Sequence, residues 1–230
     1  MPPSNDREWN AWWRVARIAG RPVLGAAFRL RFSGLEHIPA KGGALVASNH
    51  ISVLDPVFVA LATARRGRTV RYLTVSDVFA TRIVGLALRH LDQIPLRRGT
   101  GDWAAIEEVA DVIRRGSLAG ISAEGTVGDG ARLLPIQKGA ARIALAASAA
   151  VIPVGIWGTH LRWAKGGPRL GPPFRPTVSV MVGRPIEPSG DPRNRADVRL
   201  LTDRIASELE SRVASAKPGG LADTRSRDQT

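Results

Sequence analysis

The residues with the clearest chemical potential are His50 and Asp55, which stand in the segment Asn49-His50-Ile51-Ser52-Val53-Leu54-Asp55-Pro56. Within one helix, residues five apart point about 140° away from each other, so they can meet only if His50 lies in the turn before the helix. There, the carboxylate would fix the imidazole tautomer and stabilise the imidazolium that forms on proton uptake. The alternative is that Ser52 caps a helix beside an unrelated histidine.

No protein nucleophile accompanies this pair. The chain has no cysteine and no Gly-x-Ser-x-Gly segment. A His–Asp dyad without a nucleophile can still deprotonate the hydroxyl of a substrate. The lack of cysteine also excludes disulfides and thiolate metal sites, and the four histidines are too scattered to predict a metal site.

Three further segments contain candidate site residues. Two of them directly follow a short apolar stretch, and the third lies within one. Arg97 and Arg98 come after residues 94–96 and resemble an anion site, although an ordinary exposed turn fits equally well. Glu124, Gly125 and Thr126 follow residues 118–122 and could present backbone N–H groups and a carboxylate to a bound polar group. Pro153 lies in the apolar stretch 151–157, for which a core strand is the simpler interpretation.

The net charge of the chain indicates which kinds of partner it binds. The 230 residues include 33 Lys or Arg and 20 Asp or Glu, a net charge of +13. Such an excess favours an anionic partner: a nucleic acid, a phospholipid surface, or a phosphorylated or CoA-type substrate. Arginine richness can also reflect the base composition of a genome. The chain lacks an RNA-binding aromatic pattern, so nucleic acid is not the expected partner.

The elements that must position these residues alternate along the chain. Strands are expected over 44–47, 70–75, 93–96, 118–122, 151–157 and 178–182, and helices over 53–64, 81–91, 102–115, 138–148 and 197–214. This order predicts an α/β fold with a mostly parallel central sheet flanked by helices. We expect one domain over 31–216, a breaker-rich loop over 166–176, and a disordered tail over 217–230.

The N-terminal residues 1–30 form a separate amphipathic segment in this interpretation. A helix is expected over 9–21, ended or kinked by Pro22, with Arg14, Arg17 and Arg21 on one side and Trp9, Trp12 and Trp13 on the other. Tryptophan beside arginine is typical of a helix that lies in a membrane interface. The alternative is a helix that packs its tryptophans on its own domain. Without an apolar stretch of 18 residues or a signal peptide, we expect a cytoplasmic protein, peripheral on the inner face of the cell membrane.

The order of the motifs resembles the glycerolipid acyltransferase family, whose best-known members are the 1-acylglycerol-3-phosphate O-acyltransferases. The resemblance spans roughly residues 31–185. It rests on five elements in order: Asn-His-x-Ser-x-x-Asp at 49–55, Pro-x-Arg at 95–97, Glu-Gly-Thr at 124–126, Lys-Gly-Ala at 138–140 and Ile-Pro-Val at 152–154.

The resemblance implies an αβ sandwich that moves a fatty acyl group from acyl-CoA or acyl carrier protein to a lysophospholipid hydroxyl, first of all that of 1-acylglycerol 3-phosphate, giving phosphatidic acid. No other cofactor and no metal are implied. The matching residues are His50 as general base, Asp55 as its orienting carboxylate, and a substrate-binding set of Asn49, Ser52, Arg97, Arg98, Glu124, Gly125, Thr126, Arg132, Lys138 and Pro153.

One block departs from the family pattern. The family usually reads Phe-Pro-Glu-Gly-Thr-Arg-Ser, whereas Ala123, Val127 and Gly128 replace Pro, Arg and Ser here. A lost charge-assisted contact commonly costs about 1.5–3 kcal/mol. Either Arg98 or Arg132 compensates, or the acceptor differs and is glycerol 3-phosphate, another lysolipid or a glycolipid. Two other classes stay open: a basic module that binds lipid or nucleic acid without turnover, and a thioester hydrolase.

Overall fold

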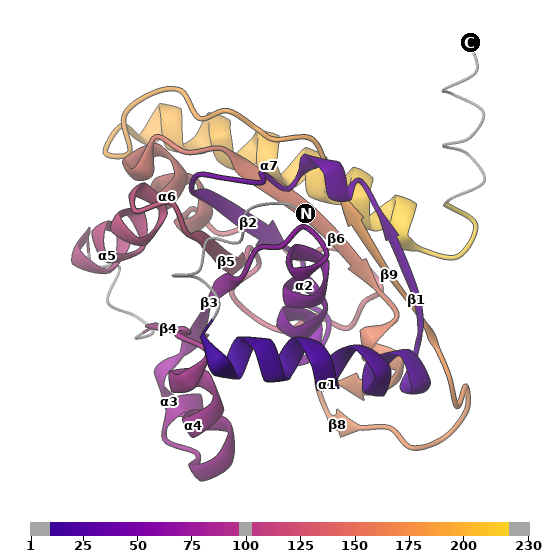
Figure 1. Ribbon diagram of the computed structural model, residues 1–230. Coiled ribbons are helices and arrows are strands. Elements are labelled where there is room, and N and C mark those ends of the chain that lie inside the picture. Colours follow the sequence, from indigo (N-terminus) through magenta and orange to yellow (C-terminus); the bar gives the residue numbers. More distant parts are fainter. Residues whose placement is uncertain (1–9, 97–102, 221–230) are drawn as a thin grey trace.

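A computed structural model describes residues 10–96 and 103–220 of the chain. Its centre is a seven-stranded sheet in the order β1-β9-β6-β2-β5-β3-β4, with helices on both faces (Figure 1). The strands are β1 (Arg29–Ser33), β2 (Ala44–Ser48), β3 (Val70–Val75), β4 (Ile94–Leu96), β5 (Leu118–Ser122), β6 (Val151–Trp157), β7 (Trp163–Ala164), β8 (Gly167–Pro168) and β9 (Thr177–Val182). The helices are α1 (Ala11–Ala27), α2 (Asp55–Ala64), α3 (Ser76–Phe79), α4 (Arg82–His90), α5 (Trp103–Arg114), α6 (Gly139–Ala147) and α7 (Arg195–Ala216), with short 3₁₀ turns at Leu35–His37 and Thr159–Leu161.

The direction of the strands decides where functional residues gather. Five neighbouring strands run parallel: β6, β2, β5, β3 and β4. Strand β9 pairs antiparallel with β6, and β1 pairs parallel with β9 at the edge of the sheet. The carboxyl ends of five strands therefore share one edge of the sheet. In open α/β sheets this edge is where ligands bind. The predicted fold class, a mostly parallel sheet between helices, is confirmed.

Each face of the sheet has its own apolar core. Leu45 and Ala47 of β2 face α5, α6 and α7, whereas Ala44 and Val46 face α2. All five residues of β2 are buried, as expected for a parallel strand covered on both faces. On the α2 side, the ring of Phe58 meets that of Phe28 edge to face at 5.1 Å. This packing fixes α2, and with it Asp55 at the first position of the helix.

Several features differ from the sequence-based expectations, among them the short helix α3, which lies where no element was predicted. The helix expected over 9–21 continues through Pro22 to Ala27, because the exposed side of the helix accommodates the proline ring. Strand β1 was not predicted, since its charged and apolar residues alternate and it pairs only at the edge of the sheet. The stretch 166–176 includes the short strand β8, which pairs with β7.

In the described part of the chain, no helix combines the length and the apolar character that a bilayer crossing requires. Residues 217–220 at the start of the expected tail follow the end of α7, and the remainder of that tail lies outside the described residues.

Candidate active site

The site is built where two neighbouring strands end. β2 and β5 are paired in parallel, with Ser48 opposite Ser122. His50 follows the end of β2 and Glu124 follows the end of β5. Backbone hydrogen bonds join the two segments beyond the sheet: Ala123 N–H donates to the Ser48 carbonyl at 2.9 Å, and Gly128 N–H donates to the His50 carbonyl at 2.7 Å. The two motifs thus form one surface although more than 70 residues separate them in sequence.

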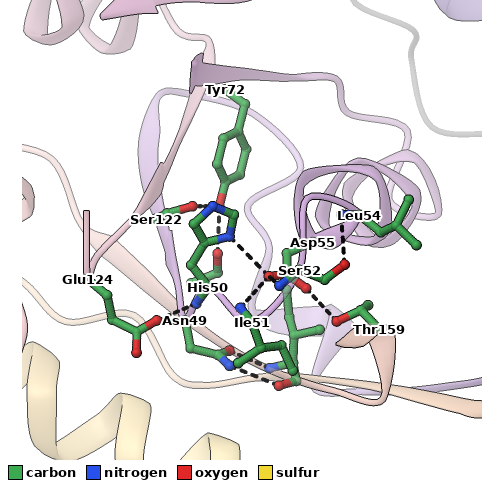
Figure 2. Close-up of polar contacts among 12 residues, drawn as sticks. Asn49, His50, Ile51, Ser52, Leu54, Asp55, Tyr72, Ser122, Glu124 and Thr159 are labelled. Carbon is green, nitrogen blue, oxygen red and sulfur yellow. Dashed lines mark hydrogen bonds and ion pairs between the residues drawn. The ribbon is translucent and has the colours of Figure 1, made fainter. Parts of the chain in front are cut away.

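His50 and Asp55 form the predicted dyad. His50 Nδ1 lies 3.1 Å from Asp55 Oδ2 (Figure 2). The histidine stands in the turn before α2 and Asp55 begins the helix, which is the arrangement that lets residues five apart meet. The Asp55 side chain is fully buried and that of His50 is 18% exposed. Because a carboxylate oxygen accepts, Nδ1 is the nitrogen that carries the proton in the neutral ring.

Asp55 is held by three further donors. Its Oδ2 accepts hydrogen bonds from the backbone N–H groups of Ile51 at 2.7 Å and Ser52 at 2.8 Å. Its Oδ1 accepts from the Thr159 hydroxyl at 2.6 Å. A buried carboxylate needs such donors to keep its charge, and the N-terminus of α2 adds a favourable dipole. The carboxylate is therefore fixed in position before any substrate arrives.

This arrangement leaves His50 Nε2 available for chemistry. Nε2 makes no hydrogen bond with any residue in the ranges 10–96 and 103–220. With Nδ1 protonated, Nε2 carries a lone pair in a partly exposed ring. Such a nitrogen can accept a proton from a hydroxyl that approaches it, and the imidazolium that results faces a fixed negative charge.

Asn49 and Ser52, predicted among the substrate-binding residues, have positioning contacts in the structure. The Asn49 amide donates to the Ile156 carbonyl at 2.9 Å and accepts from the Ile156 N–H at 2.7 Å, so it ties the end of β2 to β6. The Ser52 hydroxyl accepts from the Leu54 N–H at 3.1 Å within the turn. Both side chains are buried. They shape the turn that carries His50, and their described contacts face the protein interior.

Glu124 also acts on the turn that carries His50. Its Oε2 accepts from the His50 backbone N–H at 2.5 Å, and its Oε1 accepts from the Leu134 N–H at 2.7 Å. Burial raises the pKa of the Glu124 carboxyl, and the hydrogen bonds from Leu134 and His50 oppose that shift. The side chain thus clamps the loop 128–134 to the turn that carries His50. Its neighbours Gly125 and Thr126 are exposed, and Gly125 has the positive φ of +68° that favours glycine.

A buried polar group that the sequence analysis missed lies beside the dyad. The Tyr72 hydroxyl of β3 is 2.6 Å from Ser48 Oγ and 3.4 Å from Ser122 Oγ, and Figure 2 shows Ser122 and Tyr72 beside the His50 turn. Burial raises the pKa of Tyr72 to about 12. The ring crosses β5 over Gly120, where a Cβ atom would stand 2.3 Å from Tyr72 Cδ2. This network links β3, β5 and β2 at the edge that carries the site.

The remaining predicted site residues are placed differently. Arg132 is exposed on the 128–134 loop, and with Asn49 and Glu124 it lines a narrow hollow that has no room for a water molecule. Lys138 is exposed at the N-cap of α6. Pro153 is buried in β6 opposite Ala47, where it contributes to the sheet rather than to an open surface. Arg97 and Arg98 lie outside the described residues.

Thr159 is a further residue that the sequence analysis did not find. It stands just after β6, 104 residues from Asp55, and no local pattern marks it. Only the parallel pairing of β2 with β6 brings it to the dyad.

Comparison with known proteins agrees with this fold. A family model described as Acyltransferase matches residues 29–157, which includes the dyad and Glu124. The chain belongs to this acyltransferase family.

Individual relatives share only modest sequence identity with the chain. The chain is 25% identical over 205 residues to the chloroplastic 1-acyl-sn-glycerol-3-phosphate acyltransferase LPAT1 of Arabidopsis thaliana, covering 88% of this chain and 53% of that protein. It is 28% identical over 150 residues to the 1-acyl-sn-glycerol-3-phosphate acyltransferase of Borreliella burgdorferi, covering 59% and 54%. The chain thus spans about half the length of these relatives. The crystal structure of the 1-acyl-sn-glycerophosphate acyltransferase PlsC from Thermotoga maritima shares the fold, with a TM-score of 0.68, 21% identity, and coverage of 88% of this chain and 78% of that one.

Proposed function

We propose that the protein transfers a fatty acyl group from acyl-CoA or acyl carrier protein to the hydroxyl of a lysophospholipid, with 1-acylglycerol 3-phosphate as the first candidate acceptor and phosphatidic acid as the product. The observation that carries this proposal is the His50–Asp55 pair: Nδ1 lies beside a fixed carboxylate, and Nε2 has no hydrogen-bond partner among residues 10–96 and 103–220. Family membership and the names of the relatives supply the reaction class.

The proposed reaction needs no covalent enzyme intermediate. His50 Nε2 takes the proton of the acceptor hydroxyl as its oxygen bonds to the thioester carbonyl carbon. Asp55 stabilises the imidazolium through Nδ1. The tetrahedral intermediate then collapses, the carbon–sulfur bond breaks, and the imidazolium returns the proton to the departing thiolate. A general base of this kind contributes a factor of about 10²–10⁴.

Arg132 is the proposed partner of the acceptor's phosphate. It is exposed on the loop that Glu124 ties to the His50 turn through Leu134, and it makes no hydrogen bond or ion pair with another described residue. Arg132 would then supply the positive charge that the family usually has at the position of Val127. The same departure favours one alternative, an acceptor other than 1-acylglycerol 3-phosphate: glycerol 3-phosphate, a different lysolipid, or a glycolipid.

The proposed location is the inner face of the cell membrane, with α1 in the interface. Trp13 of α1 is buried against the domain, whereas Trp12, Val15 and Ile18 are exposed on another side, so α1 presents an apolar surface of its own. The net charge of +13 favours an anionic membrane as partner.

The test is an activity panel with purified wild type and His50→Ala. Thiol release from acyl-CoA is followed with a thiol reagent, which the cysteine-free chain does not consume. Acceptors are 1-acylglycerol 3-phosphate, glycerol 3-phosphate, a neutral lysolipid and a glycolipid. We expect acceptor-dependent release that falls by about 10²–10⁴ in His50→Ala. Full activity in His50→Ala would remove the assigned base. Thiol release that is independent of acceptor would indicate a hydrolase, and salt-sensitive nucleic-acid binding without release would indicate a binding module.

A further inference from the structure

Exposed apolar side chains are concentrated in four segments of the described chain. Fourteen large apolar residues are exposed. Four of them belong to α1, and nine follow the carboxyl ends of β2, β3 and β6. Leu200 on α7 is the remaining one. The fourteen are Trp12, Val15, Ile18, Val23, Val53, Val57, Val78, Ile83, Val84, Leu86, Trp163, Leu170, Phe174 and Leu200.

This distribution follows the sheet topology. β2, β3 and β6 belong to the parallel set, so the segments that follow them leave the sheet at one edge. His50 and Glu124 stand at that same edge. Nine exposed apolar side chains therefore belong to segments that leave the sheet at the edge that carries the candidate site. A soluble surface seldom gathers large apolar groups in this way unless it meets a partner.

The hairpin of α3 and α4 is the most prominent of these segments, and it projects from the domain in Figure 1. It is built tightly: a Cβ atom on Gly85 of α4 would stand 2.2 Å from the Phe79 carbonyl oxygen, and Arg89 donates to the same oxygen at 3.0 Å. Ile83 is 83% exposed and Leu86 is 52% exposed. The apolar side chains are thus held outward by a defined structure.

Helix α1 connects this hairpin to the segment 163–176, which also carries exposed apolar residues. At its N-terminal end, Trp13 Nε1 donates to the Leu91 carbonyl at 3.2 Å and Trp12 stacks on His90 at 4.5 Å. At its other end, Arg175 donates to the Gly25 carbonyl at 2.5 Å. In Figure 1, α1 runs from above the hairpin, on the left, to above β8, on the right. The three segments therefore form one continuous structure.

We propose that the α3–α4 hairpin and the segment 163–176 dock together with α1 on an anionic lipid bilayer. Charge selects this partner. The three segments 11–27, 76–90 and 163–176 contain eight Lys or Arg and a single acidic residue, Asp77. Apolar side chains flanked by cations suit acyl chains below anionic headgroups. A second copy of the chain would present the same positive charge and be repelled.

Docking in this orientation brings the carboxyl edge of the sheet, with His50, to the bilayer surface. A lipid substrate would then reach the site without leaving the membrane. This docking surface extends the membrane contact proposed above for α1. The experiments below measure membrane contact without a reaction, so their outcome is independent of whether acyl transfer takes place.

The first experiment places one labelled cysteine at a time in the full chain, which has no natural cysteine. Ile83→Cys, Phe174→Cys and the control Leu200→Cys each carry an environment-sensitive fluorophore. Vesicles of phosphatidylcholine with phosphatidylglycerol should shift the emission to the blue at 83 and 174 and leave 200 unchanged. Pure phosphatidylcholine should give a weaker shift. Labels at 83 and 174 that stay as water-exposed as the label at 200 overturn the proposal.

The second experiment measures sedimentation with the same vesicles. Ile83→Ser with Leu86→Ser, and Leu170→Ser with Phe174→Ser, should each lower the partition coefficient by about tenfold because two large apolar groups no longer enter the interface. Leu200→Ser is the matched control and should bind like wild type. Light scattering is run on each variant. Unchanged vesicle binding overturns the proposal, and a dimer that these substitutions split would assign the surface to self-association instead.

Discussion

The Thr159 hydroxyl donates a hydrogen bond to Asp55 Oδ1 across 2.6 Å, and both side chains are fully buried. Oδ2 of the same carboxylate faces His50 Nδ1. Thr159 therefore fixes the rotation of the carboxylate from the side that the histidine does not occupy. A residue at the end of β6 thus positions a pair that belongs to the end of β2.

Replacing Thr159 tests this relationship. Thr159→Val keeps the shape and removes the donor, and a buried hydrogen bond to a charged group is worth about 1.5–3 kcal/mol, so kcat/KM should fall by about 10- to 100-fold. Thr159→Ser should restore most of the activity. Nitrogen NMR of the His50 ring should show the Nδ1-protonated tautomer in wild type and a mixture in Thr159→Val. The same tautomer in all three proteins would reduce Thr159 to a packing residue.

Asp55→Asn should separate charge from shape. Asparagine fits the same volume and can keep the contact with the Thr159 hydroxyl, but its NH₂ group then faces the Ile51 and Ser52 N–H groups and cannot stabilise an imidazolium. We expect kcat to fall by about 10²–10⁴ with little change in KM for either substrate. Thermal unfolding and steady-state kinetics are measured together. Loss of activity that merely follows loss of folded protein would contradict the assigned role.

Glu124→Gln should loosen the turn that carries His50. A glutamine side chain has one acceptor where the structure needs two, so either His50 N–H or Leu134 N–H meets an amide NH₂ group. We expect a loss of about 1–3 kcal/mol in the free energy of unfolding, together with a lower kcat.

The pH dependence of the free energy of unfolding gives a second test of Glu124→Gln. Because burial raises the pKa of Glu124, the folded protein binds its proton more tightly than the unfolded chain does. Stability from this group is therefore present at acid pH and lost as the pH rises through the raised pKa. Relative to Glu124→Gln, wild type should gain stability when denaturation is measured below neutral pH. An equal pH profile for both proteins would exclude a titrating Glu124.

Local patterns were sufficient for much of the fold and for the dyad. The alternation of apolar stretches predicted the parallel set, because strands covered on both faces are continuously apolar, as β2 is. The dyad was predictable because His50 and Asp55 are five residues apart and a helix had to begin between them. Strand β1 escaped prediction because it lies at an edge and alternates charged with half-buried residues.

The parts of the site that escaped prediction depend on long-range pairing. Thr159 and Tyr72 reach the site only through strands β6 and β3, and nothing in their own neighbourhoods identifies them. Conversely, Asn49 was predicted to bind substrate because of its place in the motif. The structure shows its amide bonded to the Ile156 backbone, a contact that depends on the register of β6 and that the motif did not predict. Sequence spacing therefore identifies the His–Asp pair more readily than the residues that hold the pair in position.

Arg132→Ala tests whether Arg132 binds the phosphate group of the acceptor. If Arg132 binds it, KM for 1-acylglycerol 3-phosphate should rise by about tenfold or more, because a charge-assisted contact is lost. The KM for a neutral monoacylglycerol should not change, and kcat should stay within a few-fold. Arg142→Ala, on α6, serves as the control for loss of one positive charge. Equal effects of both variants on both acceptors would indicate a general charge effect.

Tyr72 gives a prediction that needs no substrate, because it is the only tyrosine in the chain. Its tyrosinate absorbance therefore reports one buried group. The raised pKa of about 12 means that the folded state holds the proton between pH 10 and 12 while the unfolded state releases it. Stability from this group is complete below pH 10 and is lost as the pH approaches 12, and at about 1.4 kcal/mol per unit the loss reaches roughly 2–3 kcal/mol. Circular dichroism recorded on the same samples should show native structure wherever Tyr72 is still protonated, and Tyr72→Phe should lose less stability over this range. Tyrosinate that forms near pH 10 while the protein stays folded would contradict the buried Ser48–Tyr72–Ser122 network.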